Sequence, residues 1–484
     1  MVVGELAESV DLLVLGGGPG GYVAAIRAAQ LGRKVTLVDQ AGPAGLGGVC
    51  LQVGCIPSKA LIELANAAHR MSEMEEMGLS ADGVTVSLER FQAWRARLCL
   101  DLARGVEQLL EDGDVSIVHG RARFNKPDRV AVRTPEDRAL FFEFGQAIIA
   151  TGSRSVELPG LPFDGERVLD STGALALDEV PASVAIVGAG YIGLELGTAL
   201  AKLGARVTVV EALDAILPAV DPSLAAPVLR RLKTLGVHVR LRATAERLEG
   251  GELVVRDAHG DQRVPAERVI VAVGRMPNTD DLGLAAAGIP VGPDGLIPVG
   301  EDMSATRRIA AIGDVVRGPA LAHKASAEGV VAAEALSGRP SAFEPAAIPA
   351  VIFTDPEIAT VGLSEGEARE AGMDVRVASF PLSASGRAGT LGEHDGFTRV
   401  VADASTDRVV GVHIVGPHAS ELAAGGTLAI ELMASPYDLT GTIHPHPTLS
   451  EGLHEAAELL LGHPIHVRTP SLNRIPKGPL HGHV

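Results

Sequence analysis

The sequence predicts an α/β protein that uses one strand–turn–helix–strand unit twice. Residues 11–40 and residues 183–212 each read as an apolar strand, a glycine-rich turn, an alanine-rich amphipathic helix and a second strand that ends in an acid. The composition agrees with this class, because 46% hydrophobic residues, 21% charged residues and 57 glycines are typical of a compact α/β protein. With 484 residues the chain is too long for one core, so about three or four domains are expected.

Both turns carry the G-x-G-x-x-G spacing of a dinucleotide-binding unit. The first glycine makes the tight turn, the second lets the backbone approach a pyrophosphate, and the third lets the helix pack on the strand. The acid about 20 positions later can accept hydrogen bonds from a ribose diol. These residues are Gly16, Gly18, Gly21 and Asp39 in the first copy, and Gly188, Gly190, Gly193 and Glu211 in the second. One copy alone could be an ordinary βα turn, but two copies in matching register predict two Rossmann-like dinucleotide-binding domains.

Two dinucleotide sites in one chain indicate a relay between a tightly held flavin and an exchangeable nicotinamide. The second acid also bears on the choice of nicotinamide. Glu211 would repel a 2'-phosphate, and the following residues, "ALDAIL", offer no Lys or Arg to hold one. The sequence therefore predicts NAD rather than NADP.

The stretch "GGVCLQVGCIPSKA" holds Cys50 and Cys55, two of only three cysteines. A structural staple, a metal clip and a redox couple are the alternatives. In a regular helix, residues five apart lie about 7.5 Å apart along the axis, whereas the Cα atoms of a disulfide are rarely more than about 6.8 Å apart. A bond therefore requires a distorted helix start, which Gly54 and Pro57 would tolerate. Such a bond is easily reduced, and its small loop contributes little as a staple.

A zinc clip needs four ligands, and no second cysteine pair or Cys-His cluster accompanies this one. The nearest histidine, His69, is expected to be a surface or core residue, so no metal is predicted. A redox couple is favoured, with the other two readings left open. Lys59, one turn after Cys55, could stabilise a thiolate or a reduced flavin. Cys99, in a separate helical stretch, is expected to be a buried apolar filler.

A series of motifs follows the first glycine turn along the chain. In order these motifs are "GGVCLQVGCIPSKAL", "ATGSR", "STGALAL", "GAGYIGLELG", "VGRMPNT", "AIGDV", "LAHKA" and "HPHPTLSE". From about residue 10 to about residue 466 the chain resembles the pyridine nucleotide-disulfide oxidoreductases. "IPSKAL" and "STGALAL" are more similar to the members that oxidise dihydrolipoyl groups than to the glutathione or mercuric reductases.

The resemblance implies an enzyme that uses FAD and NAD, and it implies a role for each site residue. Cys50 would be the interchange thiol that the substrate attacks, and Cys55 would lie nearer the flavin as the charge-transfer thiolate. Lys59 would pair with Glu195 beside the flavin and nicotinamide, and Tyr191 would shield the flavin until NAD arrives. Asp314, at the end of the strand in "RIAAIGDV", would bind the ribitol. Further cofactor contacts are implied at Gly120, Thr151, Gly152, Ser153, Gly274, Ala320, Leu321, Ala322 and His323.

A dithiol substrate must lose protons before it attacks a disulfide, so a base near neutral pKa is needed. In "HPHPTLSE" two prolines flank His446, and Glu451 follows five residues later, where it could orient the imidazole. His444 is the rival. In the family the second histidine of this motif is the base, so the resemblance assigns the roles to His446 and Glu451, supplied by the other subunit of a homodimer.

The resemblance and the pattern together predict the domains. They are an FAD-binding domain at 1–155, an NAD-binding domain at 156–277, a central domain at 278–345 that completes the FAD site, an α+β interface (dimerisation) domain at 346–466, and a tail at 467–484. The tail is expected to be a disordered end rather than an arm on the dimer.

Charge and cysteine usage narrow the partners. A formal net charge of -18 argues against nucleic acid. The N-terminus lacks the basic start of a targeting signal, no run of about 20 apolar residues predicts a membrane span, and few cysteines fit a reducing compartment, so a cytoplasmic protein is expected. The resemblance adds lipoyl domains and the acyltransferase core of a 2-oxo acid dehydrogenase complex. The alternatives are another NAD(P)H-dependent disulfide reductase, similar to glutathione reductase, and a catalytically silent flavoprotein of an assembly.

Overall fold

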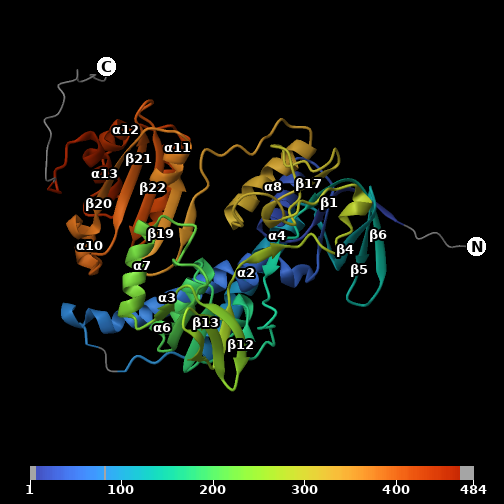
Figure 1. Ribbon diagram of the computed structural model, residues 1–484. Coiled ribbons are helices and arrows are strands. Elements are labelled where there is room, and N and C mark those ends of the chain that lie inside the picture. Colours follow the sequence, from blue (N-terminus) through green and yellow to red (C-terminus); the bar gives the residue numbers. More distant parts are fainter. Residues whose placement is uncertain (1–6, 81–82, 469–484) are drawn as a thin grey trace, which may run out of the picture. The chain divides into compact units, whose positions relative to one another are not determined.

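Two units make up the computed structural model, which describes residues 7–80 and 83–468. The first unit runs to Asp214 and resumes from Gly236 to Glu344, and the second joins Ala215–Leu235 to the chain from Pro345 onward. Each unit has its own sheets and core, and Figure 1 labels their helices and strands.

The first sheet of the first unit is built around the first glycine turn. Its strands follow the order β3-β2-β1-β6-β5-β4. β17 pairs with the C-terminal part of β6, Ala147–Ile149, whereas β5 pairs with its N-terminal part. β1, β2, β3 and β17 run parallel to their neighbours, whereas β4 and β5 extend the sheet as an antiparallel hairpin. The strands are β1 Glu8–Leu15, β2 Val35–Asp39, β3 Ser116–His119, β4 Arg121–Lys126, β5 Arg129–Arg133, β6 Ala139–Ile149 and β17 Ile309–Ala311.

Helices on this sheet bury small and aliphatic side chains against it. β1 and β6 read as continuous apolar runs because parallel strands are covered on both faces, and residues of α1, α4 and α8 join their core. The helices of this part are α1 Pro19–Gln30, α2 Gly48–Val53, α3 Cys55–Glu73, α4 Leu88–Asp112 and α8 Ala322–Leu336. α1 and α8 pack closely, since a Cβ on Gly329 would lie 2.6 Å from Gly20 O.

A second parallel sheet surrounds the second glycine turn. Its order is β11-β10-β9-β15-β8, and a three-stranded antiparallel meander, β12-β13-β14, shares its core. The strands are β8 Val168–Leu169, β9 Ser183–Val187, β10 Arg206–Val210, β11 His238–Arg240, β12 Thr244–Glu249, β13 Glu252–Asp257, β14 Gly260–Pro265 and β15 Arg268–Val271, with helices α5 Ser171–Leu175 and α6 Tyr191–Lys202. A short ribbon pairs β7 Ser153–Ser155 with β16 Arg275–Pro277.

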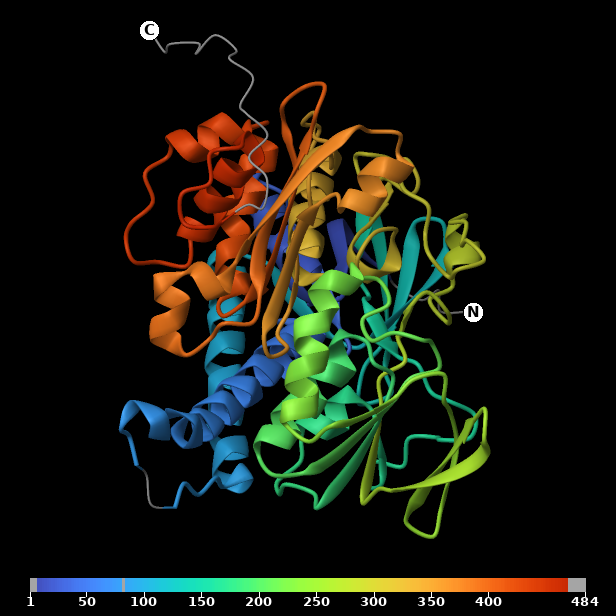
Figure 2. The same cartoon turned by 60° about the vertical axis from the view of Figure 1, so that its left-hand side comes forward.

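The second unit is a five-stranded antiparallel sheet with helices on both faces. Its order is β18-β19-β22-β21-β20, and Figure 2 shows the long strands in orange beside the red C-terminal helices. Val400 and Val412 face α11 and α13 in one core, while Arg399 on the opposite face binds Asp221 at the start of α7. The elements are α7 Pro222–Thr234, β18 Ala350–Ile352, β19 Glu357–Gly362, α9 Glu365–Glu370, β20 Val375–Pro381, α10 Gly386–Leu391, β21 Phe397–Asp403, β22 Val409–Gly416, α11 Ala419–Glu431, α12 Pro436–Gly441 and α13 Glu451–Leu461.

These sheets confirm the predicted α/β class with two Rossmann-like units and a C-terminal α+β part. The domain boundaries stay a prediction, because they are finer than the two compact units. One segment differs: α7 lies within the predicted range 156–277 but groups with the C-terminal sheet. Most of the predicted tail lies outside the described residues, which end at 468.

Candidate functional site

The first glycine turn leaves no room for side chains. Gly16 adopts a φ of +107°, and a Cβ there would lie 2.3 Å from the carbonyl oxygen of Ala150. A Cβ on Gly21 would lie 1.8 Å from Gly16 O, so only glycine lets α1 approach the strand end this closely. Gly18 is the residue before α1, and no side chain caps that helix start. Its backbone N–H groups can therefore face an anionic pyrophosphate.

The acid after this turn holds the loop in place. The Gly17 N–H and the Ala41 N–H donate to the two oxygens of Asp39 at 2.8 Å each, and Asp39 is 9% exposed. Gly120 N–H donates to the Asp39 backbone oxygen at 2.9 Å, which brings Gly120 to the same corner. A carboxylate has about four lone-pair sites, so Asp39 keeps acceptors for a ribose diol.

The second glycine turn repeats this construction residue for residue. Gly188 has a φ of +102°, and a Cβ on Gly193 would lie 2.2 Å from Gly188 O. The Ala189 N–H and the Leu213 N–H donate to Glu211 at 2.7 and 2.8 Å. The structure therefore supplies two cradles of the shape that a dinucleotide needs, as the sequence predicts.

The two site cysteines lie on consecutive helices, and one residue with non-helical backbone angles separates these helices. Cys50 lies in α2 and Cys55 begins α3, with Gly54 between the helices at φ −135° and ψ −108°. A Cβ on Gly54 would lie 2.8 Å from Val49 O. The distortion that the sequence analysis requires is therefore present, and it lies at Gly54.

Gly54→Ala is expected to destabilise the protein by about 1–3 kcal/mol, because the added methyl group overpacks a backbone contact. Thermal unfolding measures the effect. The matched control is Gly105→Ala in α4, where a Cβ meets nothing within 4 Å; that change should be neutral or stabilise by up to about 1 kcal/mol. Equal unfolding temperatures for the two variants would contradict the interpretation.

The thiols act on each other's protonation. A hydrogen bond from Cys50, opposed by burial and aided by Lys59, lowers the pKa of Cys55 to about 7. The same hydrogen bond, together with burial, raises the pKa of Cys50. The geometry therefore favours one thiolate, on Cys55, with Cys50 as the protonated donor.

Lys59 and Glu195 form an ion pair between α3 and α6. Lys59 Nζ lies 2.8 Å from Glu195 Oε2, and Glu195 is 3% exposed. Both charged groups lie close enough to Cys55 to influence its pKa. Tyr191 is the first residue of α6. Desolvation raises its pKa, and the negative charges of Cys55 and Asp314 add to that rise. The structure thus brings the predicted flavin-side residues to one place.

The segment 151–153 reaches Asp314 through a serine. The Ser153 hydroxyl donates to the Asp314 carboxylate, and the Arg275 Nε–H donates to Ser153 Oγ at 2.8 Å. Thr151 is fastened by Asn278, whose side-chain amide donates to Thr151 O at 2.9 Å. Gly274 and the motif "VGRMPNT" are predicted from the sequence, whereas the roles of Arg275 and Asn278 in holding Ser153 and Thr151 are not. The motif itself was the available signal.

Residues 320–323, which the resemblance implies as cofactor contacts, lie where α8 begins, with Ala322 as its first residue. The residue before this helix is Leu321, no side chain caps the helix, and its first turn holds no acid. The N–H groups of its first turn carry the partial positive charge of a helix N-terminus. That charge suits an electron-rich ring or another anionic group.

The predicted pair of His446, the base, and Glu451, its partner, forms in the second unit. His446 Nδ1 lies 2.8 Å from Glu451 Oε1, and the Thr448 N–H donates to Glu451 Oε2 at 2.8 Å. Burial acts to raise the pKa of Glu451, but the Thr448 N–H and His446 outweigh it and leave the pKa lowered. The His446 side chain is 79% exposed, so a substrate can reach it. His444 instead faces the His454 ring at 5.9 Å, and burial lowers its pKa.

The remaining sequence candidates lie elsewhere. Cys99 is 5% exposed in the core of the first unit, and His69 pairs with Glu73 on α3. Within residues 7–80 and 83–468, no group of three or more His, Cys, Asp or Glu could hold a metal ion. By length and composition, the span Gly48–Glu73 is the one described segment that could cross a membrane, and it is the pair α2–α3 that carries the thiols.

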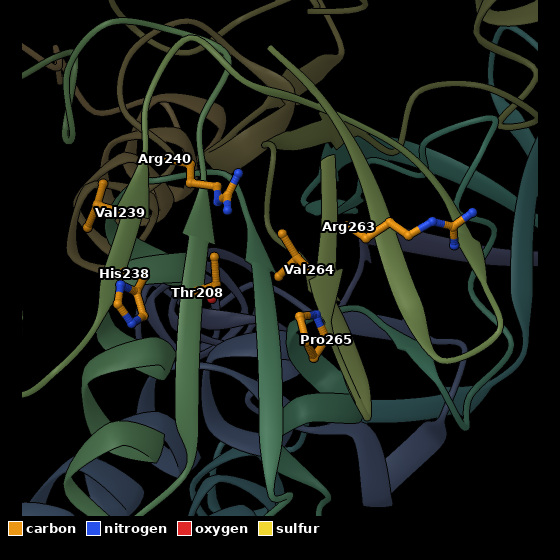
Figure 3. A pocket seen from close by; sticks show the side chains of 7 residues that line it. All are labelled: Thr208, His238, Val239, Arg240, Arg263, Val264 and Pro265. Carbon is orange, nitrogen blue, oxygen red and sulfur yellow. The ribbon is translucent and has the colours of Figure 1, made fainter. Parts of the chain in front are cut away.

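A surface groove elsewhere in the first unit contains none of the predicted site residues. Figure 3 shows its lining side chains on β10, β11 and β14, with the Arg240 side chain directed toward the side of Val264 and the Arg263 side chain extended away from the other labelled residues. Arg263 is engaged by Glu249 at 3.2 Å. The groove lies along strands rather than at a glycine turn, so we place no cofactor there.

Comparison with known proteins agrees with this geometry. Residues 10–329 match the pyridine nucleotide-disulphide oxidoreductase family, and residues 348–457 match its dimerisation domain. The chain is 49% identical to a dihydrolipoyl dehydrogenase of Geobacillus stearothermophilus over 97% of this chain and 100% of that protein. It is 45% identical to the enzyme of the same name from Bacillus subtilis over 96% and 100%.

Solved structures with the same fold extend the comparison. LpdA from Mycobacterium tuberculosis is 28% identical, with a TM-score of 0.86 over 93% of this chain and 100% of that chain. The flavoprotein disulfide reductase RclA from Escherichia coli is 27% identical, with a TM-score of 0.82 over 93% and 99%. The chain belongs to the pyridine nucleotide-disulphide oxidoreductases, and it uses FAD and NAD(H) to exchange electrons with a dithiol–disulfide pair.

Proposed function

We propose that this protein oxidises dihydrolipoyl groups and reduces NAD+. The observation that carries the proposal is the Cys50–Cys55 thiol pair beside the Lys59–Glu195 ion pair, in a unit with two glycine cradles. The curated relatives named dihydrolipoyl dehydrogenase, at 44–49% identity, support the choice of dithiol. Glu211 supports the choice of NAD, because its carboxylate would repel a 2'-phosphate.

The residues of the chain account for the thiol chemistry. His446, held by Glu451, removes the proton from one substrate thiol. The substrate thiolate attacks the sulfur of Cys50, the Cys50–Cys55 bond breaks, and Cys55 leaves as the thiolate that its lowered pKa favours. The second substrate thiol then attacks the mixed disulfide and closes the lipoyl disulfide, and Cys50 leaves and takes up a proton. When bound, FAD accepts the two electrons of the dithiol and passes them to NAD+.

An anaerobic titration with dihydrolipoamide, followed in the visible spectrum, tests the proposal. We expect a long-wavelength thiolate-to-flavin band and release of NADH when NAD+ is added. A colourless protein, or a flavin that NADH does not bleach, would favour a silent assembly component. The steady-state rate with glutathione disulfide and NADPH should be lower than the rate with lipoamide and NADH. The reverse order would favour a glutathione-type reductase.

The thiolate band should depend on pH. Since the pKa of Cys55 lies at about 7, below its ordinary value of 9.0, the thiolate persists above pH 7 and is lost as the pH falls through that value. In the reduced enzyme the band should therefore reach half its intensity near pH 7. A band that is constant from about pH 5 to about pH 9, two pH units on either side of neutrality, would contradict the hydrogen bond between the two thiols.

We also propose a homodimer, lipoyl domains with their acyltransferase core as partners, and a cytoplasmic location. The match of residues 348–457 to a dimerisation domain supports the homodimer. The net charge of -18 supports contact with a basic segment of a larger assembly. Sedimentation with a purified lipoyl domain–acyltransferase fragment would test both associations.

A further inference from the structure

A buried ion pair lies in the first turns of α8. Lys324 Nζ and Glu328 Oε1 are 2.7 Å apart, and both side chains are 2% exposed. Burial raises the pKa of Glu328, while Lys324 and a backbone N–H act against that rise. Buried charges cost free energy that their mutual attraction does not fully return. A pair of apolar residues would stabilise the fold equally well, so the ion pair needs another reason.

The ion pair binds the two peptide groups on either side of the Gly313 Cα atom. The Gly313 N–H donates to Glu328 Oε2 at 2.7 Å, and Lys324 Nζ donates to Gly313 O at 3.4 Å. Gly313 has a φ of +75°, a left-handed conformation that glycine adopts readily, and it lies two residues after the end of β17. The next residue is Asp314.

The side chain of Asp314 is held independently of this backbone. Ser153 donates to its carboxylate, and Arg275 holds Ser153 through two hydrogen bonds, to the hydroxyl at 2.8 Å and to the carbonyl oxygen at 2.6 Å. One contact fixes the carboxylate, and the ion pair fixes the peptide that precedes it.

We propose that Lys324 and Glu328 are positioning residues that hold Gly313, and through it Asp314, in the geometry that retains the flavin. This inference rests on the proposed placement of FAD next to Asp314. Neither residue touches the flavin in this proposal. Their contribution is to preorganise a ligand-binding carboxylate, and the loss of that order appears as faster release of FAD.

Two variants separate positioning from stability. Lys324→Met/Glu328→Met replaces the ion pair with apolar side chains of similar length, which removes two buried charges but leaves the Gly313 N–H without its acceptor. The protein should therefore fold with a moderately lowered unfolding temperature. Both hydrogen bonds to Gly313 are lost, so FAD release from the holoenzyme should be about tenfold faster. Glu328→Gln removes the charge but keeps an oxygen that can accept the Gly313 N–H, so FAD release should stay within about threefold of the wild type.

The control is Glu334→Gln, which breaks the ion pair between Glu334 and Arg27 at the other end of the same helix. It should leave FAD release unchanged. Release is followed by flavin fluorescence on dilution, and the visible circular dichroism of the bound flavin reports its orientation.

Each result has one meaning. Wild-type FAD release in the double variant would overturn the inference, and so would equally fast release in the double variant and in Glu328→Gln. The double variant could fail to fold, and Glu328→Gln then decides. Fast FAD release or an altered flavin circular dichroism in Glu328→Gln would overturn the inference. FAD release and circular dichroism like those of the wild type would support it. A wild-type protein without flavin would instead refute the proposed function.

Discussion

Cys50→Ser is expected to lower the turnover of dihydrolipoamide by at least about 10³-fold, because no sulfur–sulfur bond can then form with Cys55. The serine hydroxyl can still donate a hydrogen bond to Cys55, so the remaining thiol should keep its thiolate character. The flavin should remain bound, and NADH should still reduce it. Steady-state turnover, flavin absorbance and NADH bleaching measure the three quantities.

The control for this experiment is the third thiol. Cys99 is buried in the core of the first unit on α4, a different helix from those of the two site thiols, so Cys99→Ser should keep lipoamide turnover. Turnover that survives Cys50→Ser, or that falls as far in Cys99→Ser, would refute the assignment of Cys50 as the interchange thiol.

His446→Gln should have the second largest effect, a loss of about 10²–10⁴-fold in lipoamide turnover, which is the usual contribution of a general base. Glutamine keeps the size of the side chain but cannot take up the thiol proton. Glu451→Gln should act in the same direction but less strongly, because it removes the partner at 2.8 Å and leaves the imidazole. Turnover as a function of pH measures both, and the ascending limb of the profile should be lost in His446→Gln.

His444→Gln is the matched control, since His444 shares the motif but faces His454 rather than Glu451. It should retain most of the activity. If His444→Gln falls further than His446→Gln, the roles of the two histidines are exchanged. NADH reduction of the flavin should be unaffected in all three variants, because the base serves only the thiol substrate.

Local patterns predicted most of the fold and the centre of the site. The two glycine turns depend on spacing along the chain, and both form with the predicted acids on their N–H groups. The break at Gly54 followed from the distance that a disulfide can span. The pairing of His446 with Glu451 needs only five residues of chain, so the motif contains it.

Contacts between distant segments could not be predicted in this way. Arg275 reaches Ser153 across 122 positions, and no periodicity links the two. The burial of Lys324 and Glu328 could not be predicted either, because four-residue spacing between opposite charges is typical of solvated helix faces. α7 groups with the C-terminal sheet through tertiary contacts such as that between Arg399 and Asp221. Helix propensity does not predict which sheet a helix packs against.

The two functions of the Glu211 carboxylate, in the loop and toward the coenzyme, have a consequence for protein engineering. Glu211 is the residue that we expect to discriminate between NAD and NADP, yet its oxygens also accept hydrogen bonds from the Ala189 and Leu213 amides. A redesign that simply deletes the carboxylate to admit a phosphorylated coenzyme would leave two orphaned donors and loosen the loop that must receive it. Successful swaps should therefore carry a replacement acceptor, and libraries randomised at position 211 alone should recover few active clones.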